Sequence, residues 1–519
     1  MRSYNMTRRS IWILGDQLCL NHPALAACDR KTDRVIMIES RAHGQPLAFH
    51  KQKLVLIFSA MRHFAEALRK DGWQVGYIPL EADHDNASGL AECMTDHAAD
   101  EVVLMEPNSF GETQEIRGAC AAAKVEVRML PSVMFLVSRA EFSAWAGAKK
   151  HLLMEIHYRR IRAELDVLIE PDGKPVGGAW NFDIENRKTI TQWRAMGPPS
   201  PPPAPKRNRD TVTEAVIADV ERFFPDSPGD ADQFWLPVTR AESVVWLERF
   251  VADRLTRFGD FQDLMVSDEP TMFHSLISPM INIGLLEPME CVDAAVAAWK
   301  NDIAPLPAVE GFVRQILGWR EFVNGVYWLR MPEYATVNGL AAHRPLPAFF
   351  YTADTDLNCL KCSLQQVIDT GYNHHIQRLM VLGNFLLLAD VRPQDALKWF
   401  TEMYVDAHDW VMAANVLGMA LHADGGFMAT KPYAGAGAYI SKMSDYCKGC
   451  RYKPAVKSGK DACPFNLLYW AFYDRHQDRF VKNPRTSMMV RSWLARGVED
   501  RAVILREAGE FLETHVPSR

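Results

Sequence analysis

The residues whose types and spacing point most directly to chemistry are cysteines in the last third of the chain. Cys447 and Cys450 form a Cys-x-x-Cys pair, and Cys463 follows after twelve residues, directly before a proline. A second such pair, Cys359 and Cys362, lies upstream. Thiolates on two loops are suitable ligands for a tetrahedral zinc ion or for an iron–sulfur cluster. The spacing leaves both metals open, beside the simpler interpretation that these are ordinary buried thiols.

A histidine pair forms a second candidate site. His374 and His375 begin an apolar stretch, Ile376–Ala389, that is predicted to be helical. Tryptophans lie on separate predicted helices, in Gly318–Phe322 and Lys398–Phe400. Such tryptophans can stack against a flat cofactor or relay electrons, which favours a functional role for the pair. The alternative is that the histidines are merely capped and solvated and that the tryptophans pack in the core.

Two segments of the N-terminal half carry residues suited to contact a polyanion. Lys149–Arg162 is the densest basic stretch, and Gly177–Asp183, followed by Asn186 and Arg187, combines a flexible turn with aromatic side chains and a cation. Both can contact a phosphate backbone. The alternatives are a solvated helix face for the first segment and an ordinary surface loop for the second.

The elements that must position these residues divide the chain into unlike parts. Up to about residue 135, short apolar runs alternate with helical stretches, which predicts a parallel βαβ-type sheet without the glycine-rich phosphate fingerprints. A proline-rich stretch between Pro171 and Asp210 predicts a stiff linker. From Thr211 onward the apolar pattern is helical, which predicts an all-α C-terminal domain. The predicted strands and helices are Ser10–Leu14, Val35–Ile38, Lys51–Asp71, Gln74–Ile78, Glu101–Glu106, Ala241–Arg257, Ala308–Met331, His375–Ala389 and Arg392–Tyr404.

Length and composition narrow the possible classes further. The 519 residues, 48% hydrophobic and 24% charged, suffice for several compact domains and exclude a disordered or fibrous chain. The 58 basic and 64 acidic residues give a net charge of −6, so any nucleic-acid surface must be a local patch. The N-terminal residues contain no signal peptide or membrane span, so we expect a cytoplasmic protein without membrane contact. The ten cysteines are then not expected to form a disulfide framework.

An ordered series of short motifs over nearly the whole chain resembles the photolyase/cryptochrome family. The resemblance is to its bacterial iron–sulfur branch, whose characterised members are (6-4) photolyases. The motifs are Leu14–Leu18, Phe58–Phe64, Gly178–Arg187, His274–Ser278, Gly318–Phe322, His374–Arg378 and the set of Cys447, Cys450 and Cys463.

The resemblance implies an architecture and two cofactors. It implies an α/β antenna domain over residues 1–135, a linker over 136–210, and an all-α domain over 211–519 that holds FAD and a [4Fe-4S] cluster. The cluster ligands implied by matching are Cys359, Cys447, Cys450 and Cys463, with Cys362 outside the site. The implied FAD residues are His274, Ser275, Leu276, Ser278, Arg314, Arg320, Arg378, Asn384, Asp406, Asp409 and Asn415, and which aspartate pairs with Arg378 stays open.

The implied activity is light-driven repair of (6-4) photoproducts in UV-damaged DNA, after the lesion is flipped from the duplex. His375, with His374 beside it, matches the position that transfers a proton, a role that suits a side chain with a pKa near ~6.5. Trp399 and Tyr351 match an electron relay, but Phe400 and Tyr351 replace a tyrosine and a tryptophan of a close relative. The implied contacts to the lesion and DNA are Tyr433, Tyr439, Trp180, Asn181, Asp183 and Arg187.

The resemblance also implies an antenna chromophore, 6,7-dimethyl-8-ribityllumazine, in the first domain. It would lie near the residues Gly15, Asp16, Gln17 and Glu39. His43 and Pro46 depart from the pattern of relatives, where an acidic and an aromatic residue stand. The carboxyl ends of parallel strands are the expected place for such a ligand.

Two other functions compete with repair. One is a blue-light photoreceptor of the cryptochrome type with little repair activity. The other, from a different class, is a light-independent iron–sulfur module that binds nucleic acid and resembles the primase large subunit. The motifs of the first domain and of the flavin site disfavour the second alternative. We expect a monomer.

Overall fold

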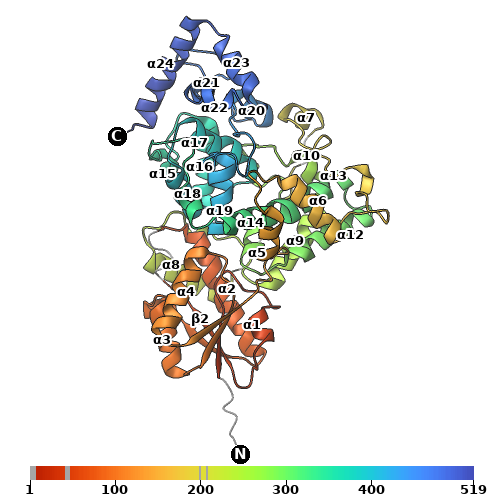
Figure 1. Ribbon diagram of the computed structural model, residues 1–519, viewed down its shortest axis with the longest axis vertical. Helices are drawn as coiled ribbons and strands as arrows, with labels where there is room; N and C mark the ends of the chain where they lie inside the picture. Colours follow the sequence, from red (N-terminus) through yellow and green to blue (C-terminus); the bar gives the residue numbers. More distant parts are fainter. Residues whose placement is uncertain (1–7, 41–46, 198–199, 206–208, 519) are drawn as a thin grey trace, which may run out of the picture.

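The computed structural model describes residues 8–40, 47–197, 200–205 and 209–518. Figure 1 shows a sheet domain near the N-terminus, a helical body above it, and the C-terminal helices at the far end. The predicted order, with the parallel sheet first and the helices after it, is the order observed.

The sheet has five parallel strands in the order β3-β2-β1-β4-β5. Alternate side chains of β1 and the residues after it point to opposite faces. Ile11 and Ile13 belong to the core that includes α2, whereas Trp12 and Leu14 pack in a core with residues of α3 and α4. The strands and covering helices are β1 (Arg9–Trp12), α1 (Pro23–Ala26), β2 (Arg34–Ile38), α2 (Lys51–Lys70), β3 (Gln74–Ile78), α3 (Asn86–Asp96), β4 (Glu101–Met105), α4 (Phe110–Ala122) and β5 (Glu126–Leu130).

Strand β5 was not predicted from the sequence. Its residues Glu126–Leu130 carry charges at alternate positions, and none of them is fully buried. An edge strand exposes half of its surface, so its apolar signal is weak. The strand order reverses between β1 and β4, and the carboxyl ends of these two strands therefore form the opening at which ligands bind in sheets of this kind.

The segment between the domains is more structured than a linker. It contains α5 (Arg139–Ala146), α6 (Met154–Glu164) and α7 (Ile190–Ala195), and these helices contact the helical body. The prolines are tied to that body as well, since Arg254 donates a hydrogen bond to the carbonyl of Pro202 at 2.6 Å.

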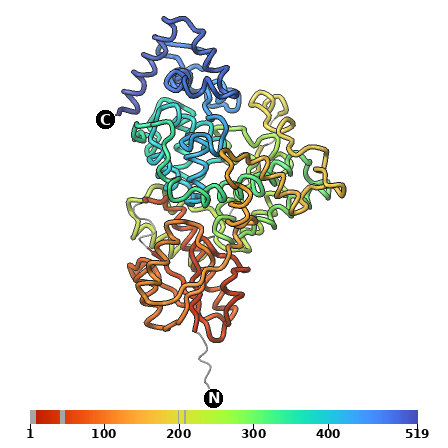
Figure 2. The backbone as a smooth tube through the Cα atoms, viewed as in Figure 1, coloured from red at the N-terminus to blue at the C-terminus, as the bar shows by residue number. Residues whose placement is uncertain are grey.

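Helix α8 (Thr211–Phe223) is the first helix of the predicted C-terminal half. It nevertheless packs against α2 of the sheet domain. Figure 2 shows this segment beside the sheet domain. Arg62 on α2 forms an ion pair with Asp219 at 2.7 Å, and Lys51 forms one with Glu221 at 2.6 Å. The chain thus crosses the helical body and returns to the sheet domain before the remaining helices begin.

The rest of the chain is helical. Three of its helical runs contain a π-helical turn, η5 (Arg314–Arg320), η7 (Gln377–Gly383) and η8 (Ala414–Ala420), and π-helical turns are frequent at functional sites. The α-helices are α9 (Arg240–Asp253), α10 (Leu255–Phe261), α11 (Ser278–Asn282), α12 (Pro288–Lys300), α13 (Leu306–Val313), α14 (Glu321–Arg330), α15 (Phe349–Thr352), α16 (Asn358–Thr370), α17 (Asn384–Leu388), α18 (Pro393–Met403), α19 (Asp409–Ala413), α20 (Gly437–Met443), α21 (Pro464–Arg475), α22 (Gln477–Phe480), α23 (Ser487–Leu494) and α24 (Val498–His515).

The sequence predicts neither a membrane span nor a disulfide framework. Within the part of the chain that the structure describes, no helix combines the length and the apolarity needed to cross a membrane. All ten cysteines are described, and each of them is a free thiol.

Candidate functional site

An arginine–aspartate pair joins three distant segments in the helical body. Arg378, in the π-helical turn η7, donates to Asp406 through Nη1–Oδ1 at 2.8 Å and Nη2–Oδ2 at 3.1 Å. The hydroxyl of Ser278, at the start of α11, donates to the same carboxylate at 2.7 Å. Burial alone would raise the pKa of Asp406, but the Arg378 guanidinium outweighs burial and holds that pKa below its usual value. The carboxylate is therefore ionised at neutral pH.

Asp409, three residues further on at the start of α19, has a different partner. Its carboxylate accepts a hydrogen bond at 2.7 Å from the hydroxyl of Ser109, which caps helix α4 of the sheet domain. His408 Nδ1 lies 3.8 Å from Asp16 Oδ2, at the carboxyl end of β1. The pairing that the sequence left open is therefore Arg378 with Asp406, and Asp409 joins the two domains.

Exchanging the two aspartates for asparagine tests this division. Asp406→Asn leaves the buried Arg378 without its counter-ion, a loss that costs about 3–5 kcal/mol when a buried pair is broken. We expect this variant to lose most of its bound flavin. Asp409→Asn, the matched control, removes a negative charge that Arg378 does not contact, keeps an oxygen that can accept from Ser109, and is expected to keep its flavin. Flavin absorbance per mole of purified protein measures both, and equal flavin content in the two variants would contradict the assignment.

The two adjacent histidines have different surroundings. The imidazole of His374 is buried and stacks on that of His274 with ring centres 4.5 Å apart and planes at 13°. Its Nδ1 accepts a hydrogen bond from the backbone N–H of Ile376 at 3.3 Å. Burial, with His274 and His375 nearby, lowers the pKa of His374 well below the usual value. His374 is thus a fixed, neutral ring.

His375 instead has an exposed side chain, although protein surrounds it on several sides. Enclosure by the protein, followed by the charges of Arg378 and Arg187, lowers the pKa of His375 to about 4. Without a bound ligand this imidazole is neutral at pH 7. It is the member of the pair that a substrate can reach.

The loop before α11 is held in an unusual conformation. Leu276 has a φ of 61°, in the left-handed region that a branched side chain rarely adopts. Arg254 donates to the carbonyls of Met272 at 3.1 Å and His274 at 3.0 Å, which fixes the loop from behind. Backbone strain of this kind concentrates at ligand sites. Ser275 and Ser278 lie on either side of the strained residue and are only half-buried.

Four other candidate cofactor residues are engaged within the protein. The Asn384 amide exchanges hydrogen bonds with the backbone of Gly435 at 2.8 and 2.9 Å, and Asn415 donates to the carbonyl of Val411 at 2.8 Å. Arg314 is almost fully buried and pairs with Asp183 and Glu310, and Arg320 pairs with Glu321 at 3.1 Å. The carboxylate contacts of Arg314 thus point to a bracing role, whereas Arg320 pairs through Nη1 alone and its buried Nε and Nη2 have no hydrogen-bond partner within the protein.

The predicted relay residues are connected through one peptide. The indole N–H of buried Trp399 donates to the carbonyl of Phe350 at 3.1 Å, and the next residue is Tyr351. The Tyr351 side chain is 45% exposed, and its hydroxyl donates to Glu402 Oε2 at 3.1 Å. The sequence did not single out Glu402, because it follows Lys398 by four residues on an amphipathic helix and resembles an ordinary solvated charge. Its carboxylate is in fact buried.

The predicted DNA loop is braced against the helical body. The Trp180 ring is half-buried and lies over the guanidiniums of Arg159 and Arg162, at 5.6 and 5.2 Å. Asn181 is exposed and donates to Glu155 Oε1 at 3.3 Å. Trp180 is therefore an anchor of the loop rather than an exposed aromatic side chain.

The end of this loop lies near the two predicted lesion tyrosines. Asp183 pairs with Arg314 and with Arg187 at 3.1 Å, and Arg187 also reaches Asp263 at 3.6 Å. Helix α7, just after Arg187, contacts α20, which carries Tyr439. Tyr433 and Tyr439 are both half-buried, and the charge of Arg187 acts on both. The loop and the tyrosines thus border the same region as His375.

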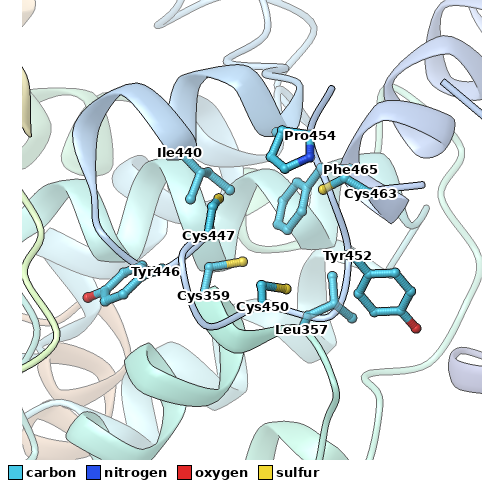
Figure 3. Close-up of a pocket in the computed structure, with 11 residues that line it drawn as sticks. Leu357, Cys359, Ile440, Tyr446, Cys447, Cys450, Tyr452, Pro454, Cys463 and Phe465 are labelled. Carbon is cyan, nitrogen blue, oxygen red and sulfur yellow. The ribbon is translucent and has the colours of Figure 1, made fainter. Parts of the chain in front are cut away.

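Four cysteines line one cavity near the C-terminal helices (Figure 3). Cys359 is the second residue of α16, Cys447 and Cys450 follow α20, and Cys463 caps the N-terminus of α21. Cys362 does not line the cavity, and its thiol lies 3.7 Å from the side-chain oxygen of Asn358. Among the described residues, no group of three or more histidine, cysteine or acidic side chains is arranged to hold a single metal ion.

Burial raises the pKa of three thiols of this cavity, those of Cys359, Cys447 and Cys463. Burial, and then the other three cysteines, raise the pKa of Cys359 well above the usual value, and burial raises that of Cys463 to about 12. Two helices, α16 and α21, begin at the cavity, and helix N-termini stabilise negative charge. The arrangement is suited to thiolates that become ionised when metal binds.

The predicted antenna residues lie at the carboxyl ends of two neighbouring strands, Gly15, Asp16 and Gln17 after β1 and Glu39 after β2. Gly15 has no room for a side chain, because a Cβ there would lie 2.9 Å from the Met61 sulfur. Burial raises the pKa of the Asp16 carboxyl to about 6, and the buried amide of Gln17 donates to the carbonyl of Glu106 at 2.9 Å. Glu39 is fully buried and its carboxylate is occupied by Arg62, by the Tyr77 hydroxyl and by the N–H of Leu80.

Both oxygens of the Glu39 carboxylate thus accept hydrogen bonds from protein groups, so this side chain is not open to a ligand. The two residues whose identity departs from the relatives' pattern, His43 and Pro46, lie outside the described residues.

Comparison with solved structures gives the class to which this fold belongs. The structure matches a bacterial class III photolyase from Agrobacterium tumefaciens with a TM-score of 0.55 and 15% sequence identity, over 98% of each chain. The fold is therefore a photolyase fold, as the sequence motifs predicted.

Sequence comparison gives the family. The family model "Deoxyribodipyrimidine photo-lyase-related protein" matches residues 11–236. A (6-4) photolyase of Agrobacterium fabrum is 41% identical over 506 residues, which are 97% of this chain and 98% of that protein. An uncharacterised protein of Acanthamoeba polyphaga mimivirus is 37% identical over 101 residues, 20% of this chain and 75% of its own. The chain belongs to the photolyase/cryptochrome family, and membership implies an FAD cofactor.

Proposed function

We propose that this protein is a light-driven (6-4) DNA photolyase. The observation that carries the proposal is the 41% identity to a (6-4) photolyase along nearly the full length of both chains. The exposed imidazole of His375, beside the Arg378–Asp406 pair and the loop of Arg187, supports it. When bound and reduced, FAD supplies an electron to the lesion after absorbing blue light.

The role of His375 is to move a proton to and from the lesion. Because its pKa is lowered to about 4 in the free protein, the imidazole must gain a proton when DNA binds. A DNA phosphate near this ring raises the pKa of His375, because a negative charge favours the imidazolium. His374 positions its neighbour, since stacking on His274 and the hydrogen bond from Ile376 fix the backbone at this point.

The residues around the Arg378–Asp406 pair fit a flavin site. The strained loop at His274, Ser275, Leu276 and Ser278 offers hydroxyl and backbone N–H groups to a diphosphate. Asn384 and Asn415 lie in or directly after π-helical turns, where their amides can form hydrogen bonds to the ring system or the ribose. Asp409, Arg314 and Arg320 have protein partners and would support this site from its edges.

The cavity of the four cysteines fits a [4Fe-4S] cluster held by Cys359, Cys447, Cys450 and Cys463. Four thiols from three chain segments surround one space, and a cluster holds its ligands on different iron atoms. A zinc ion held by the two Cys-x-x-Cys pairs would need Cys362, whose thiol lies outside the cavity. The lining therefore disfavours the zinc site that uses both Cys-x-x-Cys pairs.

The opening between β1 and β4 is suited to an antenna chromophore such as 6,7-dimethyl-8-ribityllumazine. Buried polar atoms near this opening, Asp16 Oδ1, Gln17 Oε1 and Asn108 Oδ1, have no hydrogen-bond partner within the protein. Buried acceptors of this kind normally have partners, so a ligand or water is expected to supply them. Glu39 would shape this site from behind through Arg62 and Tyr77.

Tyr351 is suited to be the outer end of the electron relay, with Glu402 as its proton acceptor. Oxidation of a tyrosine at neutral pH releases the phenolic proton, and the Glu402 carboxylate already accepts the hydrogen bond from this hydroxyl. The electron passes inward through the Phe350 peptide to Trp399, whose indole N–H is bonded to that peptide. This route avoids Phe400, which is difficult to oxidise.

Replacing Glu402 by glutamine tests the relay. The variant keeps the hydrogen bond but accepts no proton, so we expect photoreduction of bound FAD by an external reductant to be slowed about 10-fold or more, in the range of general-base effects. Tyr351→Phe is expected to show the same loss. Lys398→Ala, which removes an exposed charge that pairs with Glu402 at 3.6 Å, serves as the control and should reduce at the rate of the unaltered protein. Unchanged photoreduction in Glu402→Gln would exclude this proton acceptor.

The experiment that tests the function is irradiation with an oligonucleotide that carries one (6-4) photoproduct. Blue light is expected to restore the two thymines, which chromatography of the digested strand measures. No repair, in protein that holds FAD, would instead favour a cryptochrome-type photoreceptor. The primase-like alternative is not favoured, because the match to photolyases spans both the sheet domain and the helical body. A monomer in the cytoplasm that binds UV-damaged DNA remains the expectation.

A further inference from the structure

One apolar side chain on the DNA loop is exposed to an unusual degree. Ile184 is 96% exposed, more than any other large hydrophobic residue in the part of the chain that the structure describes. An isolated exposed apolar residue needs no explanation by itself. What distinguishes Ile184 is the rigid turn that presents it and the place at which the turn lies.

The turn that carries Ile184 is fixed on both sides. Before it, Phe182 is buried, and its backbone N–H donates to Glu310 Oε2 at 3.2 Å. The N–H of Glu185 donates back to the carbonyl of Phe182 at 3.0 Å, which closes the turn. After it, Asn186 is buried, and its amide donates to the carbonyl of Pro307 at 2.9 Å. The exposed isoleucine is therefore held in place without being packed.

The turn is also anchored through its charged neighbour. Arg187 donates its backbone N–H to the carbonyl of Gly259 at 3.0 Å and pairs with Asp263 at 3.6 Å. Met265 lies two residues after Asp263. Its N–H donates to the carbonyl of Met443, the last residue of the helix that carries Tyr439. The turn is therefore linked, through Arg187 and the segment of Asp263 and Met265, to the helix that carries the predicted lesion residue Tyr439. The action of the Arg187 charge on His375 agrees with this position.

We propose that Ile184 is a wedge that enters the base stack of damaged duplex DNA. It would fill the gap that opens when the lesion turns out of the helix toward His375. Proteins that distort DNA use apolar side chains in this way, because the wedge replaces the stacking contacts that are lost. A rigid support is required, since a mobile side chain would be pushed aside. This inference rests on the proposed repair function and assigns a residue that acts on the duplex rather than on the lesion.

The test compares double-stranded and single-stranded substrates that carry one (6-4) photoproduct, with 2-aminopurine opposite the lesion in the duplex. Ile184→Ser is expected to weaken binding of the damaged duplex about 10-fold, as expected for loss of a buried side chain of this size. Its affinity for the single strand should be unchanged, because no paired stack has to be opened. The rise in 2-aminopurine fluorescence on binding should be smaller in this variant.

Two further variants complete the design. Ile184→Leu restores an apolar side chain of equal volume and is expected to restore duplex binding. Val498→Ser, at the 72%-exposed valine that begins α24, is the matched control and should behave like the unaltered protein. Duplex binding by Ile184→Ser at the unaltered affinity, or an equal loss on both substrates, would overturn the wedge. If the unaltered protein repairs neither substrate, the proposed function fails; if it repairs both and Ile184→Ser differs in nothing, only the wedge fails.

Discussion

Replacing His375 by alanine is expected to abolish repair of (6-4) photoproducts while FAD and metal remain bound. The imidazole is exposed, so its removal disturbs little packing, in contrast to the buried ring of His374. A residue that transfers a proton in the rate-limiting step contributes typically ~10²–10⁴-fold to the rate. We therefore expect a loss of at least about 100-fold in lesions repaired per minute of illumination, measured by chromatography of the digested oligonucleotide.

The pH dependence provides an independent readout of the same residue. Only the imidazolium can donate a proton, so repair by the unaltered protein should fall as pH rises through the pKa that His375 has in the DNA complex. This pKa must lie above the value of about 4 in the free protein, and binding of damaged DNA near neutral pH should therefore take up protons. His343→Ala, at an exposed histidine on the protein surface, is the control and should keep both repair and proton uptake. Substantial repair by His375→Ala with an unchanged pH profile would contradict the assignment.

Replacing Cys450 by alanine is expected to have the second large effect, loss of the iron–sulfur cluster. In the proposed cluster site each of the four cysteines would supply one ligand from a different position around the cavity, so removal of one leaves an incomplete set. Metal binding is coupled to the folding of the loops that carry the ligands. Cys359 and Cys463 are buried and Cys447 and Cys450 half-buried, and no disulfide links them. We therefore expect iron and acid-labile sulfide per protein to fall to a small fraction and the soluble yield to drop.

Cys362→Ala is the matched control for this prediction. The residue belongs to a Cys-x-x-Cys pair, as Cys450 does, but its thiol lies outside the cavity. This variant should keep its iron and its solubility. Full iron content in Cys450→Ala, or loss of iron in Cys362→Ala, would show that the ligand set is wrong. Zinc in place of iron in the unaltered protein would show that the metal is wrong.

Local sequence pattern predicted most of the architecture. Apolar runs with strand and helix periods gave the order of the parallel sheet and the helical body, because burial of one face imposes these periods on the chain. They missed β5, whose charged alternate residues weaken the apolar signal at a sheet edge. The composition predicted a linker at Pro171–Asp210, where α7 lies, since a short helix among glycines and prolines has weak periodicity, and the linker that the resemblance implied at residues 136–210 also contains α5 and α6.

The sequence by itself determined which residues could do chemistry. The cysteine spacing, the adjacent histidines and the ordered motifs placed the chain in its family, because these features are local along the chain.

Only the tertiary structure decided which members of each set act together. It placed Asp406 rather than Asp409 on Arg378, and it gave His374 a stacked, buried ring and His375 an exposed one. It also gave Tyr351 a buried carboxylate as partner. Neighbouring residues of one type have almost the same sequence signature, but contacts with other segments of the chain, such as Arg378 with Asp406 and Ser109 with Asp409, determine which of them faces the site.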